Sequence, residues 1–384
     1  TGKTVTVNSI TLSNGTNGGL AANYSISTGQ TTTANITAKS LTVSGITASN
    51  KTYDGNAVAT LNTGSVAYSG LVDGDTFDGT YTGAFSDKNV GTGKTVTITP
   101  SYSGADVSNY SITNHANVTA NITAKPLTVS GVTASDKTYD GSVTATMNSS
   151  SAVYSGFVSG DDFTGSYSGV FADANVGTGK TVNITSSYSG ADVSNYNITD
   201  QTSTTANIIA KALTATASAS NKVYDGSSAA TVTLSLSGFI GSETVTSTNS
   251  STFNNKNAGT GKTVTVNSIT LANGSNGGLA ANYTISTGQT TTANITVKSL
   301  TVSGITASNK TYDSTTSATL GTGAVIYGGK VSGDDFTGSY SGVFADANVG
   351  TGKTVTITSS YAGADVSNYN ITDQTSTTAD ISAK

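Results

Sequence analysis

The chain has 384 residues and a formal net charge of −5, with 17 basic against 22 acidic residues. It holds no cysteine and a single histidine, which excludes thiol nucleophiles and structural zinc sites and leaves no set of histidines for serine-hydrolase chemistry. No arginine occurs, so bidentate phosphate clamps are excluded, and an acidic chain with dispersed lysines is a poor partner for nucleic acid.

Strands are the predicted elements along the whole chain, because Val, Ile, Leu, Tyr and Ala alternate with Thr and Ser. In the best-marked segment we expect strands at 41–48, 57–61, 94–102 and 119–125, with a bulge at Ser44-Gly45. No helical periodicity appears, and no apolar run approaches the roughly 18 residues of a membrane span. An all-β chain without membrane insertion is expected.

A five-residue corner follows the first strand and recurs along the chain, as KTYDG at 51–55 and 137–141, KVYDG at 222–226 and KTYDS at 310–314. We expect the aspartate to bond the turn backbone, the glycine to relax φ and the tyrosine to pack at the end of the repeat. These corner residues are Tyr53, Asp54, Gly55, Tyr139, Asp140, Gly141, Tyr224, Asp225, Gly226, Tyr312 and Asp313, with Ser314 in place of the last glycine.

Two further motifs share the period of the corner. GTGKTV occurs at 91–96, 177–182, 259–264 and 350–355, and each unit closes on a TANIT-K-like strand. Cutting after the closing lysines predicts four repeats preceded by a half repeat: 1–39, the C-terminal half of a truncated repeat; 40–125; 126–211; 212–298, a variant with a Gly-rich hairpin; and 299–384. Because 1–39 matches 260–298 and 40–125 matches 299–384 at one offset, we expect the fragment to belong to a longer array.

About seven short strands in each repeat, with turn residues every 8–12 positions, predict an immunoglobulin-like antiparallel sandwich. Successive repeats join without a Pro/Gly/Ser spacer, and Pro126 even stiffens one junction. Such junctions limit bending, so the predicted architecture is a tandem array that forms an elongated rod.

The combination of the SNKTYDG corner, the FSDKNVGTGKTV turn and the SNYSI strand resembles the YDG/MBG-type bacterial Ig-like repeats of large surface adhesins, including filamentous-haemagglutinin-like exoproteins of two-partner secretion. The resemblance covers every repeat. It implies the stalk or fibre region of an extracellular adhesin or biofilm-matrix protein at the bacterial cell surface, and it implies no catalytic residue. The departures are Ser314 and the longer hairpin of the variant repeat.

Acidic turns are the only metal candidates. Oxygen-rich turns can hold Ca²⁺, but the EF-hand spacing is absent, and we expect solvated turns and no cofactor. The Ca²⁺ candidates are Asp73, Asp75, Asp161, Asp162, Asp334 and Asp335. GTGKT lacks the first glycine of a Walker motif, so we read it as a turn into a strand. His115 has no counterpart in the other repeats and is expected in a surface loop.

Two alternatives to the stalk remain open. Tyr68, Tyr81, Tyr154 and Tyr167 could form a strip that stacks on surface or matrix polysaccharide, although such tyrosines are ordinary on alternating strands. The chain could instead be a self-assembling filament subunit. Isopeptide cross-links, which need a buried acid in a chain whose only glutamate is Glu243, and glycosylation of Asn-x-Ser/Thr sites are also open.

An enzyme is the least favoured class, because the acid–base inventory is nearly empty. The expected partners are the neighbouring repeats of the same chain. Residues 1–39 would expose an inner face and strand edges, so we expect them to be completed by upstream residues or by strands of another copy.

Overall fold

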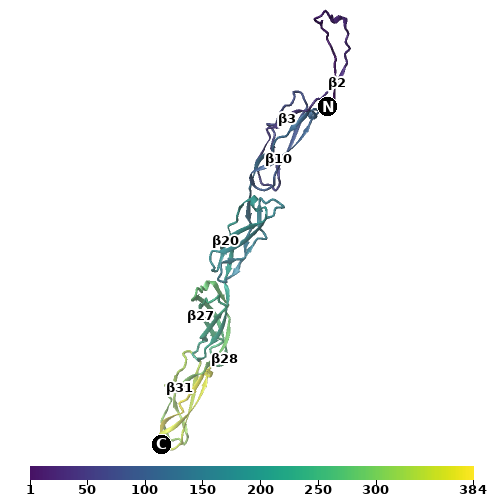
Figure 1. Ribbon diagram of the computed structural model, residues 1–384. Coiled ribbons are helices and arrows are strands. Elements are labelled where there is room, and N and C mark those ends of the chain that lie inside the picture. Colours follow the sequence, from purple (N-terminus) through teal and green to yellow (C-terminus); the bar gives the residue numbers. More distant parts are fainter. The chain divides into compact units, whose positions relative to one another are not determined.

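The computed structural model describes residues 1–384 and is all-β (Figure 1). Strands follow one another along the whole chain, interrupted by loops and by five single-turn 3-10 helices. None of these helices has the length or hydropathy needed to span a bilayer. The same set of sheets recurs in tandem, so the chain consists of repeated β domains.

Contacts divide the chain into two units that we describe separately. The first unit holds Thr1–Ala134, Thr146–Val170 and Val182–Thr204, and the second holds Ser135–Ala145, Phe171–Thr181 and Thr205–Lys384. The repeat 126–211 therefore contributes to both units.

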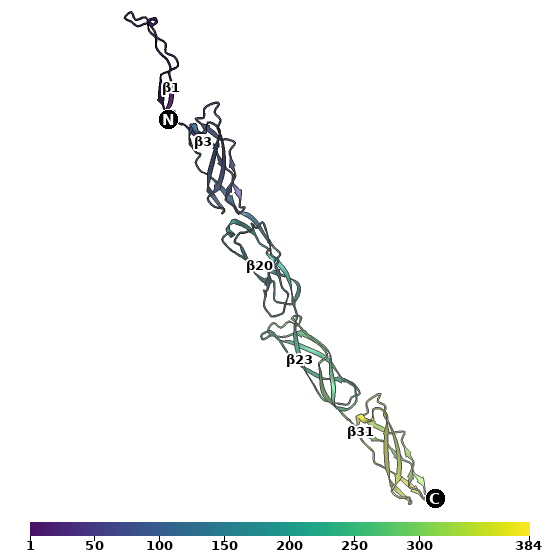
Figure 2. The same ribbon diagram turned by 90° about the vertical axis from the view of Figure 1, so that its right-hand side faces the viewer.

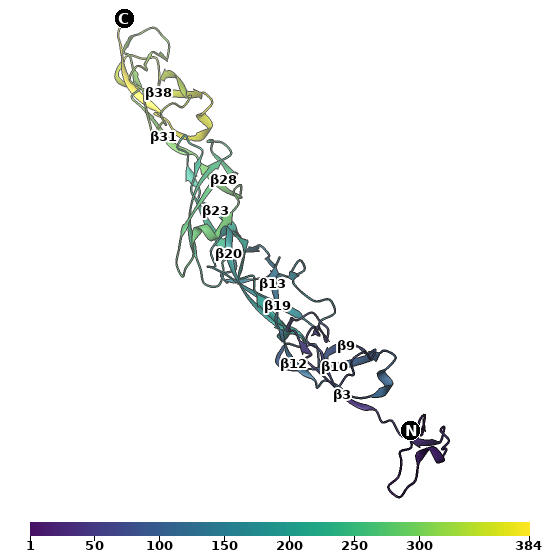
Figure 3. The ribbon, with the colours of Figure 1, turned by 90° about the horizontal axis from the view of Figure 1, so that it is seen from above.

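The repeat 40–125 has a five-stranded sheet and a three-stranded sheet. The larger has the order β5 (Lys51–Thr52), β12 (Val118–Thr123), β10 (Gly91–Ser103), β9 (Asp78–Phe85) and β6 (Val58–Ala59). The smaller has the order β11 (Tyr110–Thr113), β3 (Lys39–Ser44) and β8 (Ala67–Ser69), while β4 (Thr47–Ala48) pairs with β7 (Leu61–Asn62). Figure 3 shows β9, β10 and β12 side by side. The 3-10 helix η2 (Val107–Asn109) precedes β11.

The expectation of purely antiparallel strands is wrong. The first strand, β3, runs parallel to β11 with Lys39 opposite Tyr110, and β5 runs parallel to β12 with Lys51 opposite Ile122. Each parallel pair joins segments about 70 residues apart, well above the crossover of about a dozen residues that parallel neighbours require. Alternation of side chains has the same period in both kinds of pairing, so it could not distinguish them.

The predicted bulge also lies elsewhere. In β10 the register shifts between Gly91 and Lys94, where Gly93 has φ +60°. At Ser44-Gly45 the strand β3 simply ends, and Gly45 has φ +84°. A Cβ on Gly45 would lie 2.0 Å from the carbonyl oxygen of Ser65, so the glycine is required by the close approach of two backbones.

The core of this repeat is lined by side chains from both sheets. Leu41 and Val43 of β3 pack with Ile98 of β10 and Tyr110 of β11. Phe85, Val96, Ala120 and Ile122 of the five-stranded sheet are also buried, and they belong to an apolar cluster that includes Leu127 and Val129 of the next repeat. One residue, Ala124, separates β12 from the first strand of that repeat.

The remaining repeats keep this plan with five- and three-stranded sheets. In the repeat 126–211 the elements are β13 (Lys125–Ser130), β14 (Thr133–Ala134), β15 (Lys137–Thr138), β16 (Thr144–Ala145), β17 (Met147–Asn148), β18 (Val153–Ser155), β19 (Thr164–Phe171), β20 (Gly177–Ser189), η3 (Val193–Asn195), β21 (Tyr196–Thr199) and β22 (Ser203–Ile209).

The variant repeat and the last repeat lie in the second unit. The variant repeat comprises β23 (Lys211–Ala219), β24 (Lys222–Val223), β25 (Ala229–Ala230), β26 (Val232–Ser237), β27 (Val245–Phe253), β28 (Gly259–Asn273), η4 (Ala280–Asn282), β29 (Tyr283–Ile285) and β30 (Thr290–Thr296). The last repeat comprises β31 (Lys298–Ser303), β32 (Thr306–Ala307), β33 (Lys310–Thr311), β34 (Ser317–Ala318), β35 (Leu320–Gly321), β36 (Ile326–Gly328), β37 (Thr337–Phe344), β38 (Gly350–Ala362), η5 (Val366–Asn368), β39 (Tyr369–Thr372) and β40 (Ser376–Ser382).

The half repeat 1–39 consists of β1 (Lys3–Thr6), η1 (Ala21–Asn23) and β2 (Thr31–Ala34), and β1 is drawn in purple in Figure 2. The strands β1 and β2 pair only with each other. Their register, with Lys3 opposite Ala34, is that of β28 and β30 in the variant repeat, with Lys262 opposite Ala293.

We expect Ile122→Ala to lower the free energy of unfolding by about 2–5 kcal/mol, because it leaves a cavity at a fully enclosed site. The matched control is Ile36→Ala, the same position of the TANIT strand in the half repeat, which should change stability by less than about 0.5 kcal/mol. Ile122 is 1% exposed and Ile36 is 75% exposed. Guanidinium unfolding followed by circular dichroism measures both, and equal losses would contradict the assignment of the core.

Candidate functional site: the joint between consecutive repeats

The YDG corner is closed by its own lysine. Lys51 Nζ donates to Asp54 Oδ1 at 2.7 Å and to the carbonyl oxygens of Asn56 and Val58 at 2.7 and 3.1 Å. Asp54 Oδ1 also accepts the backbone N–H of Asn56. The corner of the last repeat has the same arrangement, and there the hydrogen bond from Lys310 lowers the pKa of Asp313 to about 2.

The tyrosine side chain of the corner contacts the following repeat. Within the first unit, the Tyr53 hydroxyl donates to Asp161 of the repeat 126–211, at 2.9 Å from both carboxylate oxygens. The ring of Tyr53 packs edge-to-face on Tyr196, with centroids 5.6 Å apart. The Tyr196 hydroxyl donates to the same carboxylate at 2.6 Å and accepts the backbone N–H of Val158. Asp161 therefore holds one tyrosine from each repeat.

A lysine lies between the two carboxylates of this joint. Lys88 Nζ lies 3.1 Å from Asp161 and 2.9 Å from Asp192. Its hydrogen bond lowers the pKa of Asp192, while the two carboxylates raise the pKa of Lys88. Burial, followed by the hydrogen bond to Asp161, raises the pKa of Tyr53 and keeps its hydroxyl protonated as a donor.

An asparagine fixes the turn that carries this lysine. Asn195 is fully buried, and its Oδ1 accepts the backbone N–H of Val90 at 2.9 Å. Its Nδ2 donates to Asn89 Oδ1 at 3.1 Å. We call Tyr53, Gly55 and the turn 87–90, with their counterparts, the corner surface. The acceptor site is the set Val158, Asp161, Asp192, Asn195 and Tyr196, with its counterparts.

The corner glycine faces the acceptor site. Gly55 has φ +84°, and a Cβ on it would lie 2.7 Å from Val158 Cγ1. Gly226 has the same relation to Val331. Ser314, at the same position of the repeat 299–384, keeps a positive φ of +64° and is exposed.

Within the second unit, the joint between the variant repeat and the last repeat has the same chemistry. The Tyr224 hydroxyl donates to Asp334 at 3.0 Å, and Lys256 Nζ lies 2.9 Å from Asp365. The Asn368 side chain accepts the backbone N–H of Ala258 at 2.8 Å.

The other joint of the second unit is different in charge. The Tyr139 hydroxyl donates to Glu243 at 2.8 Å, and Tyr283 donates to the other oxygen of that carboxylate at 2.6 Å. The position of the lysine is taken by Ala174, and the position of the second aspartate is taken by Leu279. A joint with two aspartates therefore contains a lysine, and the joint with one glutamate contains none.

Most Ca²⁺ candidates are engaged by the protein itself. The expectation of solvated acidic turns is wrong for Asp161 and Asp334, whose side chains are buried and accept tyrosine hydroxyls, and Asp75 accepts the hydroxyl of Tyr110. Asp162 and Asp335 are exposed and accept backbone N–H groups, and Asp73 is exposed. No group of three or more His, Cys, Asp or Glu side chains is arranged to hold a metal ion.

The tyrosines considered for sugar stacking are half-buried within their own repeats. The Tyr81 hydroxyl donates to Tyr68 at 3.2 Å, and Tyr167 donates to Tyr154 at 3.0 Å. Their rings belong to aromatic clusters with Phe77 or Phe163. His115 lies in the loop between β11 and β12.

Sequence reasoning missed the acceptor site. Its residues lie in a turn, in or beside the 3-10 helix η3 and at the start of β21, and these segments resemble ordinary loops and strands in sequence. Tyr53 lies 108 residues from Asp161. One signal was available: lysine at the fourth position of the FSDKN-type turn accompanies aspartates in the following repeat, whereas alanine precedes the repeat that holds Glu243 and Leu279.

Comparison with known proteins identifies the class of repeat. A family model described as the YDG domain matches residues 37–119, 123–205, 209–293 and 296–378. The chain therefore belongs to the YDG domain family, as four tandem copies. No curated protein matches the chain.

Two solved structures have weak similarity to this chain. A Drosophila N-cadherin EC1-4 crystal structure is 10% identical, covers 88% of this chain and 99% of its own, and has a TM-score of 0.22. A titin I9-I11 tandem is 10% identical, covers 66% of this chain and 98% of its own, and has a TM-score of 0.16.

We expect Tyr53→Phe to destabilise the first joint by about 1.5–3 kcal/mol, because the ring remains but Asp161 loses a hydrogen bond to its charged oxygens. The matched control is Tyr312→Phe, since Tyr312 occupies the same corner position but is 40% exposed, against 1% for Tyr53. Amide exchange of residues 158–162 reports on the joint. A comparable loss in the control would contradict this account.

We expect Lys88→Ala to change the pH dependence of stability. In the folded protein the pKa of Asp192 is lowered by Lys88, so the stability that it contributes is present above the unfolded value near 4 and is lost as pH falls through the folded value. The variant should therefore be less stable at pH 7, and the difference from wild type should shrink below about pH 4. Denaturant midpoints at pH 7, 4 and 3 measure this, and a constant difference would contradict it.

Proposed function

We propose that these repeats are a structural stalk or fibre region of an extracellular bacterial adhesin or biofilm-matrix protein. The role is to project or link binding domains that lie outside the repeats. The resemblance to surface-adhesin repeats at the bacterial cell surface motivates the cellular setting, and the joints motivate the mechanical role.

The observation that carries the proposal is the burial of a corner tyrosine in the following repeat. Tyr53, Tyr139 and Tyr224 are each at most 4% exposed, and each donates to a carboxylate of the next repeat. A hydrogen-bonded and apolar joint resists bending more than a flexible linker does. Repeats that contact only their neighbours in this way favour an elongated rod.

The proposal includes an immunoglobulin-like sandwich for each repeat. In the repeat 40–125 the two sheets share one core, which supports an immunoglobulin-like sandwich. The single histidine and the absence of cysteine leave few groups for acid–base or nucleophilic chemistry, which supports a role without catalysis and without a cofactor.

Electron microscopy of the chain 1–384 tests the proposal. We expect thin rods of uniform length for wild type, because each joint fixes two neighbouring repeats. The triple variant Tyr53→Ala, Tyr139→Ala and Tyr224→Ala should give bent, heterogeneous particles with unchanged circular dichroism, because it removes the contacts but keeps the sheets.

The matched control is Tyr312→Ala, which changes the same corner position without a partner and should leave the rods straight. Compact wild-type particles, or rods that remain straight in the triple variant, would contradict the stalk proposal.

A further inference from the structure

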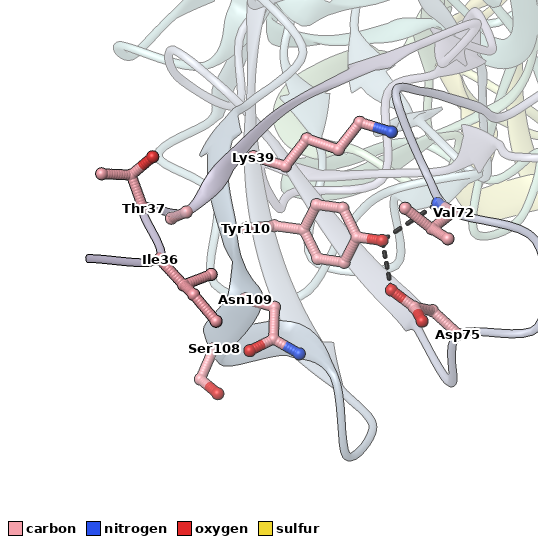
Figure 4. A pocket seen from close by; sticks show the side chains of 9 residues that line it. Ile36, Thr37, Lys39, Val72, Asp75, Ser108, Asn109 and Tyr110 are labelled. Carbon is pink, nitrogen blue, oxygen red and sulfur yellow. Dashed lines mark hydrogen bonds between the residues drawn. The ribbon is translucent and has the colours of Figure 1, made fainter. Parts of the chain in front are cut away.

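The acceptor site of the repeat 40–125 is complete but has no corner surface against it. Its residues are Val72, Asp75, Asp106, Asn109 and Tyr110. Together with Ile36–Lys39, most of them line a pocket of about 470 Å³. In Figure 4 the Tyr110 hydroxyl bonds to Asp75 and to the backbone N–H of Val72, as Tyr196 does to Asp161 and Val158 in the occupied site.

The uncovered residues are those that a corner surface buries elsewhere. Asn109 is exposed, whereas its counterparts Asn195, Asn282 and Asn368 are at most 1% exposed. Val72 is also exposed, whereas Val158 and Val331 are half-buried. The site therefore retains its geometry and lacks only the groups that occupy the other three sites.

The half repeat beside this pocket also has an exposed apolar face, and the corresponding face is buried in the variant repeat. Val5, Val7, Tyr24 and Ile36 are exposed, while their counterparts in the variant repeat, Val264, Val266, Tyr283 and Ile295, are buried. In that repeat β24 pairs with β30 at Ile295. The corresponding residue Ile36 has no strand partner, and β2 ends at Ala34.

We infer that the half repeat and the acceptor site together bind one polypeptide segment with the features of residues 212–259. This segment supplies the strands that cover Val264 and Ile295 in the variant repeat, and it carries Tyr224 and Lys256 of a corner surface. The bound tyrosine donates to Asp75, and the bound lysine lies between Asp75 and Asp106. The segment thus repeats the joint between the variant repeat and the last repeat.

The two aspartates of the acceptor site require a partner with a lysine. This requirement excludes a second copy of the chain that binds through the corner of its last repeat. The exposed corner of the last repeat carries Ala347 where Lys88 and Lys256 stand. Its insertion would bring Asp75 and Asp106 together without a cation, and burial of unpaired carboxylates is costly. The acceptor site is therefore selective for a corner surface that carries a lysine.

The test is binding of a fluorescent synthetic peptide of residues 212–259 to the intact chain 1–384, measured by anisotropy, with amide exchange to locate the bound peptide. We expect saturable binding, with slower exchange at residues 31–38 and 72–76. A Lys256→Ala peptide should bind at least about tenfold more weakly, because the two aspartates lose their cation.

In the chain, Asp106→Asn should weaken binding of the wild-type peptide. It should also reduce the ratio between the affinities of the wild-type peptide and the Lys256→Ala peptide. Tyr312→Phe in the chain is the control, and it should leave the affinities of both peptides unchanged. No saturable binding, protection that omits residues 31–38, or equal affinity of the two peptides would overturn the inference. Sedimentation of the unmodified chain tests the charge selectivity. Head-to-tail association of chains that Tyr312→Ala abolishes would overturn it.

Discussion

The hydrogen bond from a corner tyrosine to a carboxylate of the following repeat is the interaction that joins consecutive repeats. It pairs two buried polar groups, and an unpaired hydroxyl or carboxylate at this place would be unfavourable. Each carboxylate, Asp161, Glu243 or Asp334, also accepts the tyrosine of its own repeat. One acidic side chain therefore couples the interior of its repeat to the corner of the preceding one.

Each joint has one more carboxylate than lysines, and the two kinds of joint differ in how many of each they contain. Lys88 and Lys256 face pairs of aspartates, whereas Ala174 accompanies the single carboxylate Glu243. An exchange of corner surfaces between the two kinds of joint would leave two neighbouring carboxylates without a lysine in one of them, and buried carboxylates without a cation are costly. The variant repeat is thus distinguished by its joints as well as by its longer hairpin.

Much of the repeat plan could be predicted from the sequence, because strand alternation and a fixed period are local signals. The all-β class and the recurrence of the corner follow directly from them. The parallel pairs β3–β11 and β5–β12 could not be predicted, since they join distant segments. The acceptor site was hidden for the same reason: Tyr53 and Asp161 are remote in the chain, and Asp161 resembles any solvated turn residue.

A double-mutant cycle of Tyr53→Phe and Asp161→Asn tests the central claim most directly, with unfolding free energies measured for wild type, both single variants and the double variant. The account predicts a coupling energy of about 1–3 kcal/mol, because Tyr53→Phe removes the hydrogen bond and Asp161→Asn removes the charge that strengthens it. Strictly additive effects would contradict it, since the tyrosine and the carboxylate would then stabilise the two repeats independently.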